Sequence, residues 1–447
     1  MSSPLNQLFV LVSIFVSFGF CSFNQPDFPP VYLTLSPLYR EATHSTKLID
    51  REVQIQWVNN SVDSIALYNT NPKDKSEPVL EFKTLLYPDG FVSTNIPFGD
   101  PEFPGGWEKE SKDLPVSGDH CLPIWVLAYK DKNLIFSDCF KIRPTWMQDN
   151  RLSLENLELT SLFIPGTHNS GSYRRTDTPG QRDSSGRYII TQDQNLWQQL
   201  VYGVRYLDFR IGYYNLRKNG SETAEDDSSF WINHDLIKIR KLLPLLDDLK
   251  QFMKKTKEEI VILDLHRFPL GFTGRPFRHH QLVKLLEREL KEYAVPYKKD
   301  YIPTLGSIWD QGKRIVISYG DNIVAQEYDW LWPPIRQLWG NKQTTEGLYN
   351  YLEKCMTNDS LRNPERGLWA AMAQLTPGPL DLLFNPKGSL RIMASQINRN
   401  LTEWCRERWW DRANILAMDF FLGTDTITTA VLSNVFKGST AKHYVTN

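Results

Sequence analysis

Short apolar or alternating runs dominate the chain between about residues 32 and 142, and segments rich in Pro, Gly, Asp and Asn separate them. Apolar residues at every second position are typical of strands with one buried face, and these separators are the residues that end strands. We therefore predict a small antiparallel β-sandwich here. The runs are VYLTL, EVQIQWV, SIALYN, VLEFKTLLY, PIWVLAY and LIFSDCFKI.

The pattern changes after the segment 144–159, and strand-like runs then alternate with helix-like ones. Residues 260–265 are almost all apolar, as in a strand buried on both faces. In the helix-like run that precedes this strand, apolar residues recur every three or four positions, which predicts one buried helix face. These residues are Leu242, Leu246, Leu249 and Met253. Nearly 300 residues of strand–helix units predict an α/β fold, a TIM-like βα barrel with fewer regular strands than eight. A doubly wound open sheet is the alternative, but no Gly-rich nucleotide motif follows the first strand.

These patterns divide the chain into a β-sandwich domain at 22–148 and a barrel domain at 149–447. Residues 1–21 are expected to be a signal peptide, because the apolar run 8–20 is too short to span a bilayer and precedes a possible cleavage after Cys21. We therefore expect a secreted protein, and retention by an uncleaved anchor is the alternative. The sandwich carries no convergent set of catalytic residue types and is predicted to be a packing or adaptor domain, with a partner that the sequence does not identify.

Cleavage after Cys21 would leave four cysteines, an even number suited to an oxidising compartment. Proximity within each domain favours the pairs Cys121–Cys139 and Cys355–Cys405, although four cysteines allow three connectivities. Glycosylation triplets agree with a secretory route. They begin at Asn59, Asn219, Asn358 and Asn400.

The charge balance argues against a polyanionic partner. With 51 basic and 52 acidic residues, the chain offers no long-range attraction for nucleic acid. Any recognition of phosphate must therefore be local.

Polar residues follow the predicted strands of the second domain, at the edge where parallel α/β folds place their ligand sites. Two histidines, an arginine and carboxylates are the groups that cleavage of a phosphodiester by an internal hydroxyl requires. One imidazole removes a proton, the other donates one, and the guanidinium neutralises charge on the phosphoryl oxygens. The strand ends are Thr167-His168-Asn169, Asp208-Phe209-Arg210, His234-Asp235, Asp264-Leu265-His266 and Asp419.

The segments LFIPGTHNSGSY, GVRYLDFR, FWINHD and EEIVILDLH together resemble the X region of phosphatidylinositol-specific phospholipase C, and their order is similar to that in secreted animal PLC X domain-containing proteins. The resemblance covers most of residues 159–421. It implies a phosphatidylinositol-type lipid at a membrane surface as the substrate, and cyclic inositol phosphate plus diacylglycerol as products.

The resemblance also implies a role for each matching residue. His168 would be the general base and His234 the general acid, while Arg210 would hold the phosphate. Asp208 would organise the site and Asp419 would orient His168. His266, Asp264 and Tyr319, at or near the ends of later strands, are expected to contact the substrate.

Arg210 stands where calcium-dependent relatives carry an acidic ligand, so the resemblance implies no metal and no other cofactor. Asn169 departs from the metal-free bacterial pattern, which has Asp after the base, and His266 matches neither pattern. These departures keep open a catalytically weak or inactive protein that binds a phosphorylated ligand. A metal-dependent phosphodiesterase of another lipid is the third reading, and Arg210 argues against it. The loop 329–334, DWLWPP, is a candidate for inserting two indoles into a membrane or, equally, for packing over the barrel.

Overall fold

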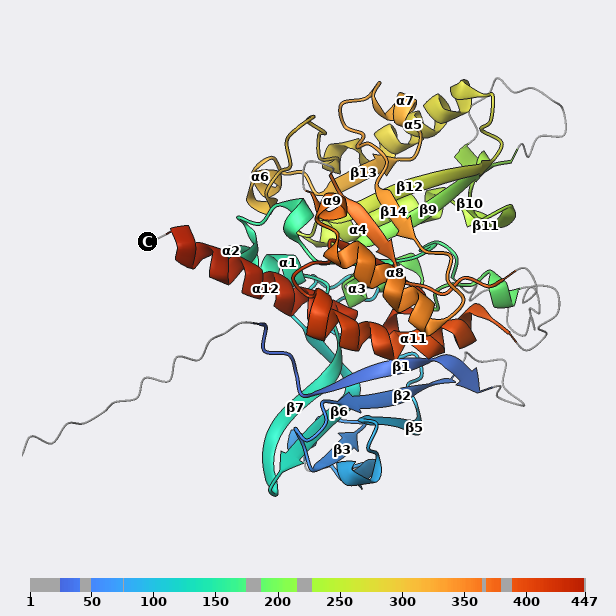
Figure 1. Cartoon of the computed structure of the whole chain (residues 1–447). Helices are drawn as coiled ribbons and strands as arrows, with labels where there is room; N and C mark the ends of the chain where they lie inside the picture. The colour runs from blue at the N-terminus through green and yellow to red at the C-terminus, as the bar shows by residue number, and fades with distance from the viewer. Residues whose placement is uncertain are drawn as a thin grey trace, which may run out of the picture.

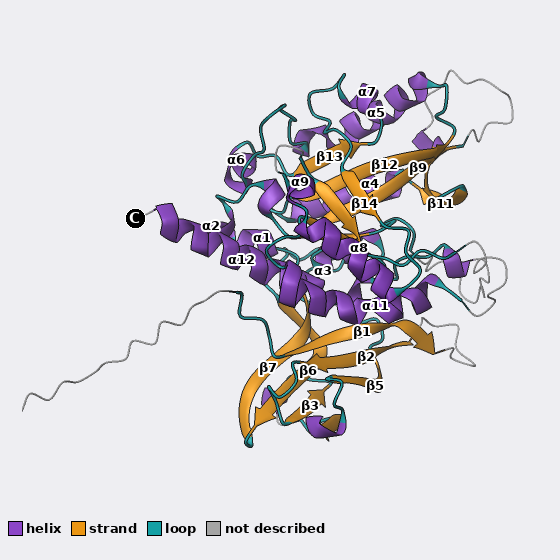
Figure 2. Cartoon of the chain, in the orientation of Figure 1, coloured by secondary structure: helices purple, strands orange, loops and turns teal. Residues whose placement is uncertain are grey.

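The computed structural model describes residues 25–40, 50–74, 76–173, 186–214, 227–363, 367–378 and 388–445. The expected signal peptide, residues 1–21, and the triplet at Asn219 lie outside these ranges and stay predictions. Figures 1 and 2 show a β-rich N-terminal part beside a larger part in which helices surround a sheet.

The N-terminal part contains two antiparallel sheets. One has the order β1-β2-β5, with bounds Val31–Arg40, Asp50–Trp57 and Phe91–Pro97. The other has the order β4-β3-β6-β7, with bounds Leu80–Lys83, Ser64–Tyr68, His120–Lys130 and Asn133–Ile142. The sequence runs correspond to six of these seven strands and missed β5, in which only Val92 and Thr94 are buried. The domain boundary at 148/149 remains a prediction.

Among the described residues, seven parallel strands form the centre of the second part, in the order β14-β15-β16-β8-β9-β12-β13. A hairpin of β10 (Phe230–His234) and β11 (Ile237–Lys241) continues antiparallel from the far end of β9. The parallel strands are β8 (Ile164–Thr167), β9 (Tyr206–Tyr213), β12 (Val261–Leu270), β13 (Ile315–Tyr319), β14 (Arg336–Trp339), β15 (Trp369–Met372) and β16 (Ile415–Met418).

The two ends of this parallel sheet meet at β13 and β14 without a continuous ladder among the described residues. An isolated bridge pairs Ser318 with Trp332 just before β14. The Ser318 hydroxyl also donates to Pro333 O at 3.2 Å and accepts from Ile335 N at 3.1 Å. The prediction of a mixed α/β fold is therefore confirmed, whereas a regular ring of eight strands is not what the described residues form.

Helices pack against the outer face of the parallel sheet (Figure 1). The positions predicted for the buried face of the helix after β11 are indeed buried in α4 and at its N-cap. No described helix has the length and apolar character needed to cross a membrane. The longer helices are α3 (Leu196–Tyr202), α4 (Leu243–Lys255), α5 (Pro276–Leu290), α8 (Thr345–Thr357), α11 (Leu390–Trp404) and α12 (Thr426–Val445). Shorter ones are α1 (Trp146–Asp149), α2 (Arg151–Leu154), α6 (Leu305–Asp310), α7 (Asn322–Ala325) and α9 (Asp359–Arg362).

The N-terminal strands share a core with the larger part. Trp107, which is fully buried, packs against Phe252 of α4, and its carbonyl accepts from the indole N–H of Trp197 on α3 at 2.9 Å. Figure 1 shows β1 running beside α11. The two parts are therefore packed together through apolar and polar contacts.

The loop 329–334 does not offer its indoles to a membrane. Trp330 and Trp332 are each 4% exposed, and the Trp332 N–H donates to Val295 O at 2.8 Å. A buried indole is stabilised by apolar contacts and a satisfied N–H, so these rings belong to the core. The packing interpretation of this loop is the correct one.

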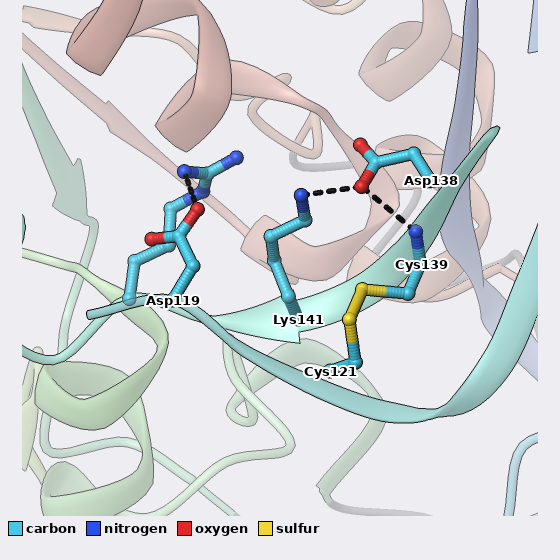
Figure 3. The surroundings of a disulfide bond; sticks show 6 residues. Asp119, Cys121, Asp138, Cys139 and Lys141 are labelled. Carbon is cyan, nitrogen blue, oxygen red and sulfur yellow. Dashed lines mark hydrogen bonds and ion pairs between the residues drawn. A yellow bond between two sulfur atoms is a disulfide. The ribbon is translucent and has the colours of Figure 1, made fainter. Parts of the chain in front are cut away.

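One of the two predicted disulfides is present. Cys121 and Cys139 join the neighbouring strands β6 and β7, beside ion pairs of Asp138 with Lys141 and of Asp119 with Arg143 (Figure 3). The pairing of Cys355 with Cys405 is wrong, because both are free and buried. Cys355 lies on α8 beside Tyr351, whereas Cys405 follows α11 inside the apolar core.

Candidate active site

Side chains alternate between the two faces of each strand, and this alternation decides which strand-end residues lie on the inner face of the parallel sheet. On β9, Tyr206 and Asp208 face inward, whereas Leu207 and Phe209 pack in the core beneath the surrounding helices. Successive side chains of a strand point to opposite faces, so Arg210 joins Asp208 on the inner side. Asp264 of β12 bonds Tyr206 and therefore lies on the same side.

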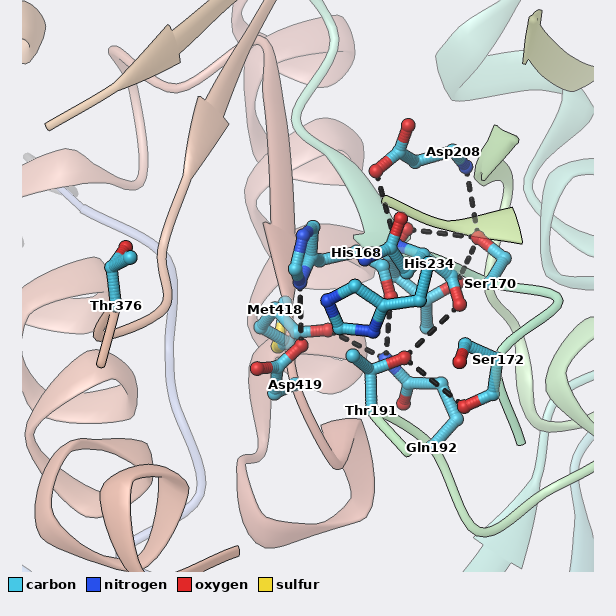
Figure 4. A network of polar contacts seen from close by, with 12 residues as sticks. His168, Ser170, Ser172, Thr191, Gln192, Asp208, His234, Thr376, Met418 and Asp419 are labelled. Carbon is cyan, nitrogen blue, oxygen red and sulfur yellow. Dashed lines mark hydrogen bonds and ion pairs between the residues drawn. The ribbon is translucent and has the colours of Figure 1, made fainter. Parts of the chain in front are cut away.

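His168 and Asp419 follow the neighbouring strands β8 and β16, and their side chains meet (Figure 4). His168 Nδ1 lies 2.8 Å from Asp419 Oδ1, and both residues are buried. Because a carboxylate only accepts, Nδ1 carries the proton and Nε2 is left with its lone pair. Gly166 permits this close strand packing, since a Cβ there would lie 2.7 Å from the Tyr206 ring.

Arg210 directs its guanidinium at that lone pair. Its Nη2 donates to His168 Nε2 at 3.1 Å, and Nη1 lies 3.5 Å from Asp235 Oδ1. Arg210 Nε is buried and has no hydrogen-bond partner among the described residues. A buried donor without a partner costs free energy, and an anionic ligand that accepted a hydrogen bond from this nitrogen would remove that cost.

His234 approaches the same place from the hairpin. Its ring centre lies 6.3 Å from that of His168, and the rings are nearly perpendicular. His234 Nδ1 donates to Ile189 O at 2.6 Å, which leaves Nε2 for exchange of a proton with a ligand. Burial lowers the pKa of His234, and the neighbouring His168 and Arg210 lower it further.

Two buried carboxyl groups lie beneath these residues, joined by Gln337 of β14. Gln337 Nε2 lies 3.1 Å from Asp208 Oδ1 and 3.3 Å from Asp264 Oδ2. Burial would raise the pKa of Asp208, but Arg210 and His168 outweigh it and hold that pKa below its usual value. Burial, together with the charge of Asp208, raises the pKa of Asp264 to about 7. Asp208 is therefore the anion of the pair, and Asp264 holds a proton up to about neutral pH.

Replacing Asp264 with Asn should stabilise the protein more at high pH than at low pH. A carboxyl group with a pKa of about 7 in the folded protein and 3.8 when free in water binds a proton only in the folded chain between those values. Its contribution to the free energy of unfolding is complete below the lower value and is lost as the pH rises through the higher one. We therefore expect the Tm of Asp264→Asn, relative to wild type, to increase from about pH 5 to about pH 8.

Calorimetry of both proteins across this range measures the difference. His266, whose pKa burial lowers to about 4, is protonated mainly below this range. Asp411→Asn, at a half-exposed carboxylate, is the control and should show no such trend. A Tm difference independent of pH would contradict the assignment of the proton to Asp264.

Asn169 has a left-handed backbone, with φ of 43°, and is 1% exposed. Asn is one of the few residues other than glycine that adopts this conformation readily. Its N–H donates to Asp208 Oδ2 at 3.0 Å, while neither polar atom of its side chain has a partner in the described part of the chain. The side-chain amide is thus buried next to His168 with its hydrogen-bonding capacity unused.

The structure separates the three expected substrate contacts. His266 lies on the inner side of β12, with Nδ1 3.6 Å from Asp264 Oδ2, and Asp264 lies deeper in the buried network. Tyr319 is not part of this group, because strand alternation turns it outward. Its hydroxyl bonds His279 Nδ1 at 2.9 Å, and its ring packs on Phe268. Ser318, one residue earlier, is the residue of β13 that faces inward, bonding Asp264 at 3.0 Å.

Three polar residues support the site without having been predicted. Gln337 links the buried carboxyl groups, and Thr191 and Gln192 bind backbone oxygens at both ends of the His168–Asp419 pair. Little in the sequence marks Gln337, because β14 is four residues long and reads RQLW.

In the ranges that the structure describes, no three His, Cys, Asp or Glu side chains converge as they would around a metal ion. The residues at the predicted site are instead a mixture of imidazoles, one guanidinium, an amide and carboxyl groups. Metal independence remains a prediction.

Comparisons with known proteins give relatives of the chain, although no protein-family model matches it. Human PI-PLC X domain-containing protein 1 is 27% identical over 318 residues, 66% of this chain and 93% of that protein. Mouse PI-PLC X domain-containing protein 2 is 26% identical over 65% of this chain and 87% of that protein. These curated homologues confirm the resemblance found in the sequence.

Among solved structures, phosphatidylinositol-specific phospholipase C from Listeria monocytogenes matches with a TM-score of 0.48 and 20% identity, covering 65% of this chain and 98% of that one. A point mutant of the phosphatidylinositol-specific phospholipase C from Staphylococcus aureus matches with a TM-score of 0.47 and 18% identity, over 65% and 96% of the two chains.

Proposed function

We propose that this homologue of PI-PLC X domain-containing proteins is a phosphodiester-cleaving lyase acting on a phosphatidylinositol-type lipid. The observation that carries the proposal is the direct contact of Arg210 with the lone pair of His168, whose other nitrogen is bound to Asp419. A base, its orienting carboxylate and a phosphate-binding cation therefore share one buried place, and His234 faces it. We take the surrounding parallel sheet to be an irregular βα barrel with this site at its carboxyl edge.

The first step is binding of the phosphodiester. Its anionic oxygens would draw the guanidinium of Arg210 away from His168, since a planar fork binds phosphate through two hydrogen bonds. His168 Nε2 is then free to accept the proton of the inositol 2-hydroxyl as that oxygen attacks phosphorus. Asp419 stabilises the imidazolium that forms.

The second proton transfer belongs to His234. Its lowered pKa describes the protein without a ligand, and the negative charge of a bound phosphodiester acts in the opposite direction. His234 Nε2 would donate its proton to the diacylglycerol oxygen as the P–O bond breaks. The products are a cyclic inositol phosphate and diacylglycerol. Water is not consumed, so the reaction needs no other reactant.

We propose the tip of the β10–β11 hairpin as the part that contacts the lipid surface. Leu236 and Ile237, two and three residues after His234, are 68% and 48% exposed, and the exposed residues Lys238 and Lys241 follow them. Exposed apolar side chains flanked by lysines suit an interface containing anionic lipid. This position also places the membrane on the side of His234, where diacylglycerol departs.

Exchanging both apolar residues for serine, Leu236→Ser with Ile237→Ser, should weaken vesicle binding at least about tenfold, since each loses part of a burial worth roughly 1.5 to 3 kcal/mol. Sedimentation with vesicles of phosphatidylinositol and phosphatidylcholine measures the binding. Turnover of soluble glycerophosphoinositol should be unchanged. Leu85→Ser with Leu86→Ser, two consecutive residues that are 89% and 70% exposed on the N-terminal part, is the matched control. Equal vesicle binding by the two double variants would contradict this placement of the membrane.

The assay that tests the proposed function is incubation of the purified protein with phosphatidylinositol in EDTA, with detection of cyclic inositol phosphate. Product formed in EDTA supports the metal-free lyase. Product only after calcium is added rejects the role given to Arg210. Vesicle binding without product under either condition favours a binding protein. A secreted location is part of the proposal, and the Cys121–Cys139 disulfide is compatible with it.

A further inference from the structure

Asp193 connects the N-terminal sheet to the loops of the candidate site. Arg391, at the start of α11, binds both carboxylate oxygens of Asp193, with Nη1 2.9 Å from Oδ2. Arg51 of β2 lies 3.4 Å from the same carboxylate, and Arg391 Nη1 also donates to Pro37 O of β1 at 3.0 Å. The three charged side chains are only 9–12% exposed. Strand β2 therefore contacts Asp193 through Arg51, and strand β1 is linked to Asp193 through Arg391.

The two residues before Asp193 hold the two ends of the His168–Asp419 pair. Gln192 Nε2 donates to Met418 O at 2.8 Å and to His168 O at 3.2 Å. The Thr191 hydroxyl donates to Asn169 O at 3.0 Å, and Thr191 O accepts from Phe420 N at 2.8 Å. Figure 4 shows Thr191 and Gln192 beside Met418 and Asp419. A displacement of Asp193 would therefore move the backbone on both sides of the dyad.

The residue after Asp419 needs support of its own. Phe420 has a left-handed backbone, with φ of 48°, which is costly for a residue with a bulky side chain. Two residues of α11 hold it: the guanidinium of Arg391 lies 4.4 Å from the centre of its ring, and Asn398 Nδ2 donates to Phe420 O at 3.1 Å. Arg391 thus contacts the N-terminal sheet, Asp193 and the neighbour of Asp419 at once.

From these contacts we infer that Asp193 and Arg391 are positioning residues, through which strands β1 and β2 fix the orientation of Asp419 and His168. The N-terminal sheet is then a part of the catalytic unit rather than an independent adaptor. This inference rests on the proposed function for its effect on turnover, while its effect on the geometry of His168 does not.

The test compares arginines that join the same two parts of the molecule. Arg391→Gln breaks the contacts with Asp193, and Arg51→Gln breaks only the longer one. Arg399→Gln is the matched control, because Arg399 also lies on α11 and binds the N-terminal part, through Asp89 O and the ring of Phe91, but leads to no residue of the site. Arg391→Lys is the conservative variant. We expect Arg391→Gln to lower kcat on phosphatidylinositol on the order of tenfold more than Arg399→Gln, at similar KM and at a temperature where both variants are folded. Arg51→Gln should show a smaller loss and Arg391→Lys a partial recovery.

The second measurement does not need activity. The proton on His168 Nδ1, held against Asp419, should give a low-field NMR signal that Arg391→Gln broadens or shifts and Arg399→Gln leaves in place. An inactive wild type rejects the proposed function but leaves this signal to test the inference. If Arg391→Gln and Arg51→Gln both match Arg399→Gln in the signal, and in kcat where the wild type is active, the inference is overturned.

Discussion

Replacing His168 with alanine is expected to lower the rate of cyclic inositol phosphate formation by about a hundredfold to ten-thousandfold. The lone pair of His168 Nε2 faces the guanidinium of Arg210, and Asp419 binds the other ring nitrogen, Nδ1. Without the imidazole, the inositol hydroxyl must lose its proton to water. The effect should fall on kcat, because Arg210 still binds the phosphate.

Single-turnover assays with phosphatidylinositol vesicles measure this loss directly. His280→Ala is a suitable control, since His280 lies on α5, has a side chain that is 38% exposed and contacts Tyr328 rather than the site. Retention of the wild-type rate within about tenfold in His168→Ala would falsify its assignment as the general base. Equal losses in both variants would point to a general effect on folding, which a Tm measurement identifies.

The other large effect is expected at Arg210, where the change to alanine should reduce kcat about a hundredfold to a thousandfold. Its guanidinium contacts His168 directly. Its Nε has no hydrogen-bond partner among the described residues and could donate to an anion. Charge that grows on the phosphoryl oxygens would no longer be neutralised.

Arg210→Lys separates charge from geometry. A lysine keeps the positive charge but cannot form two parallel hydrogen bonds to one phosphate, so an intermediate rate is expected. All three proteins should be assayed in EDTA and again with calcium. A wild type that requires calcium, or an Arg210→Ala variant as fast as wild type, would show that Arg210 does not supply the charge.

The rule that ligands bind at the carboxyl ends of parallel strands was sufficient to select residues that the structure brings together. His168, Arg210 and Asp419 come from three different strands and lie in one hydrogen-bonded group. The rule could not rank residues within a strand end. Tyr319 shows this, because it ends β13 as expected but alternation turns it toward His279. Counting the period of two from Ser318 would have identified the error.

Residues that support the site through amides could not be predicted. The side-chain nitrogens of Gln337 and Gln192 each bind oxygen atoms of residues that are far away in the sequence. No local sequence pattern marks such a role. Pairing of distant side chains is equally invisible, which explains the mistaken Cys355–Cys405 disulfide. The fold was easier to predict, since alternating and helical periodicities are local. The strand β5 was missed, since few of its positions are buried.

The two free cysteines among the described residues affect what happens after the protein unfolds. Burial raises the pKa of the Cys355 and Cys405 thiols, so both stay protonated and unreactive while the chain is folded. Unfolding would release both as nucleophiles in a chain that already contains the Cys121–Cys139 bond. Thiol–disulfide exchange can then trap the unfolded chain with non-native disulfides. The rate of heat inactivation would therefore depend on the rate of unfolding rather than on the equilibrium free energy of unfolding.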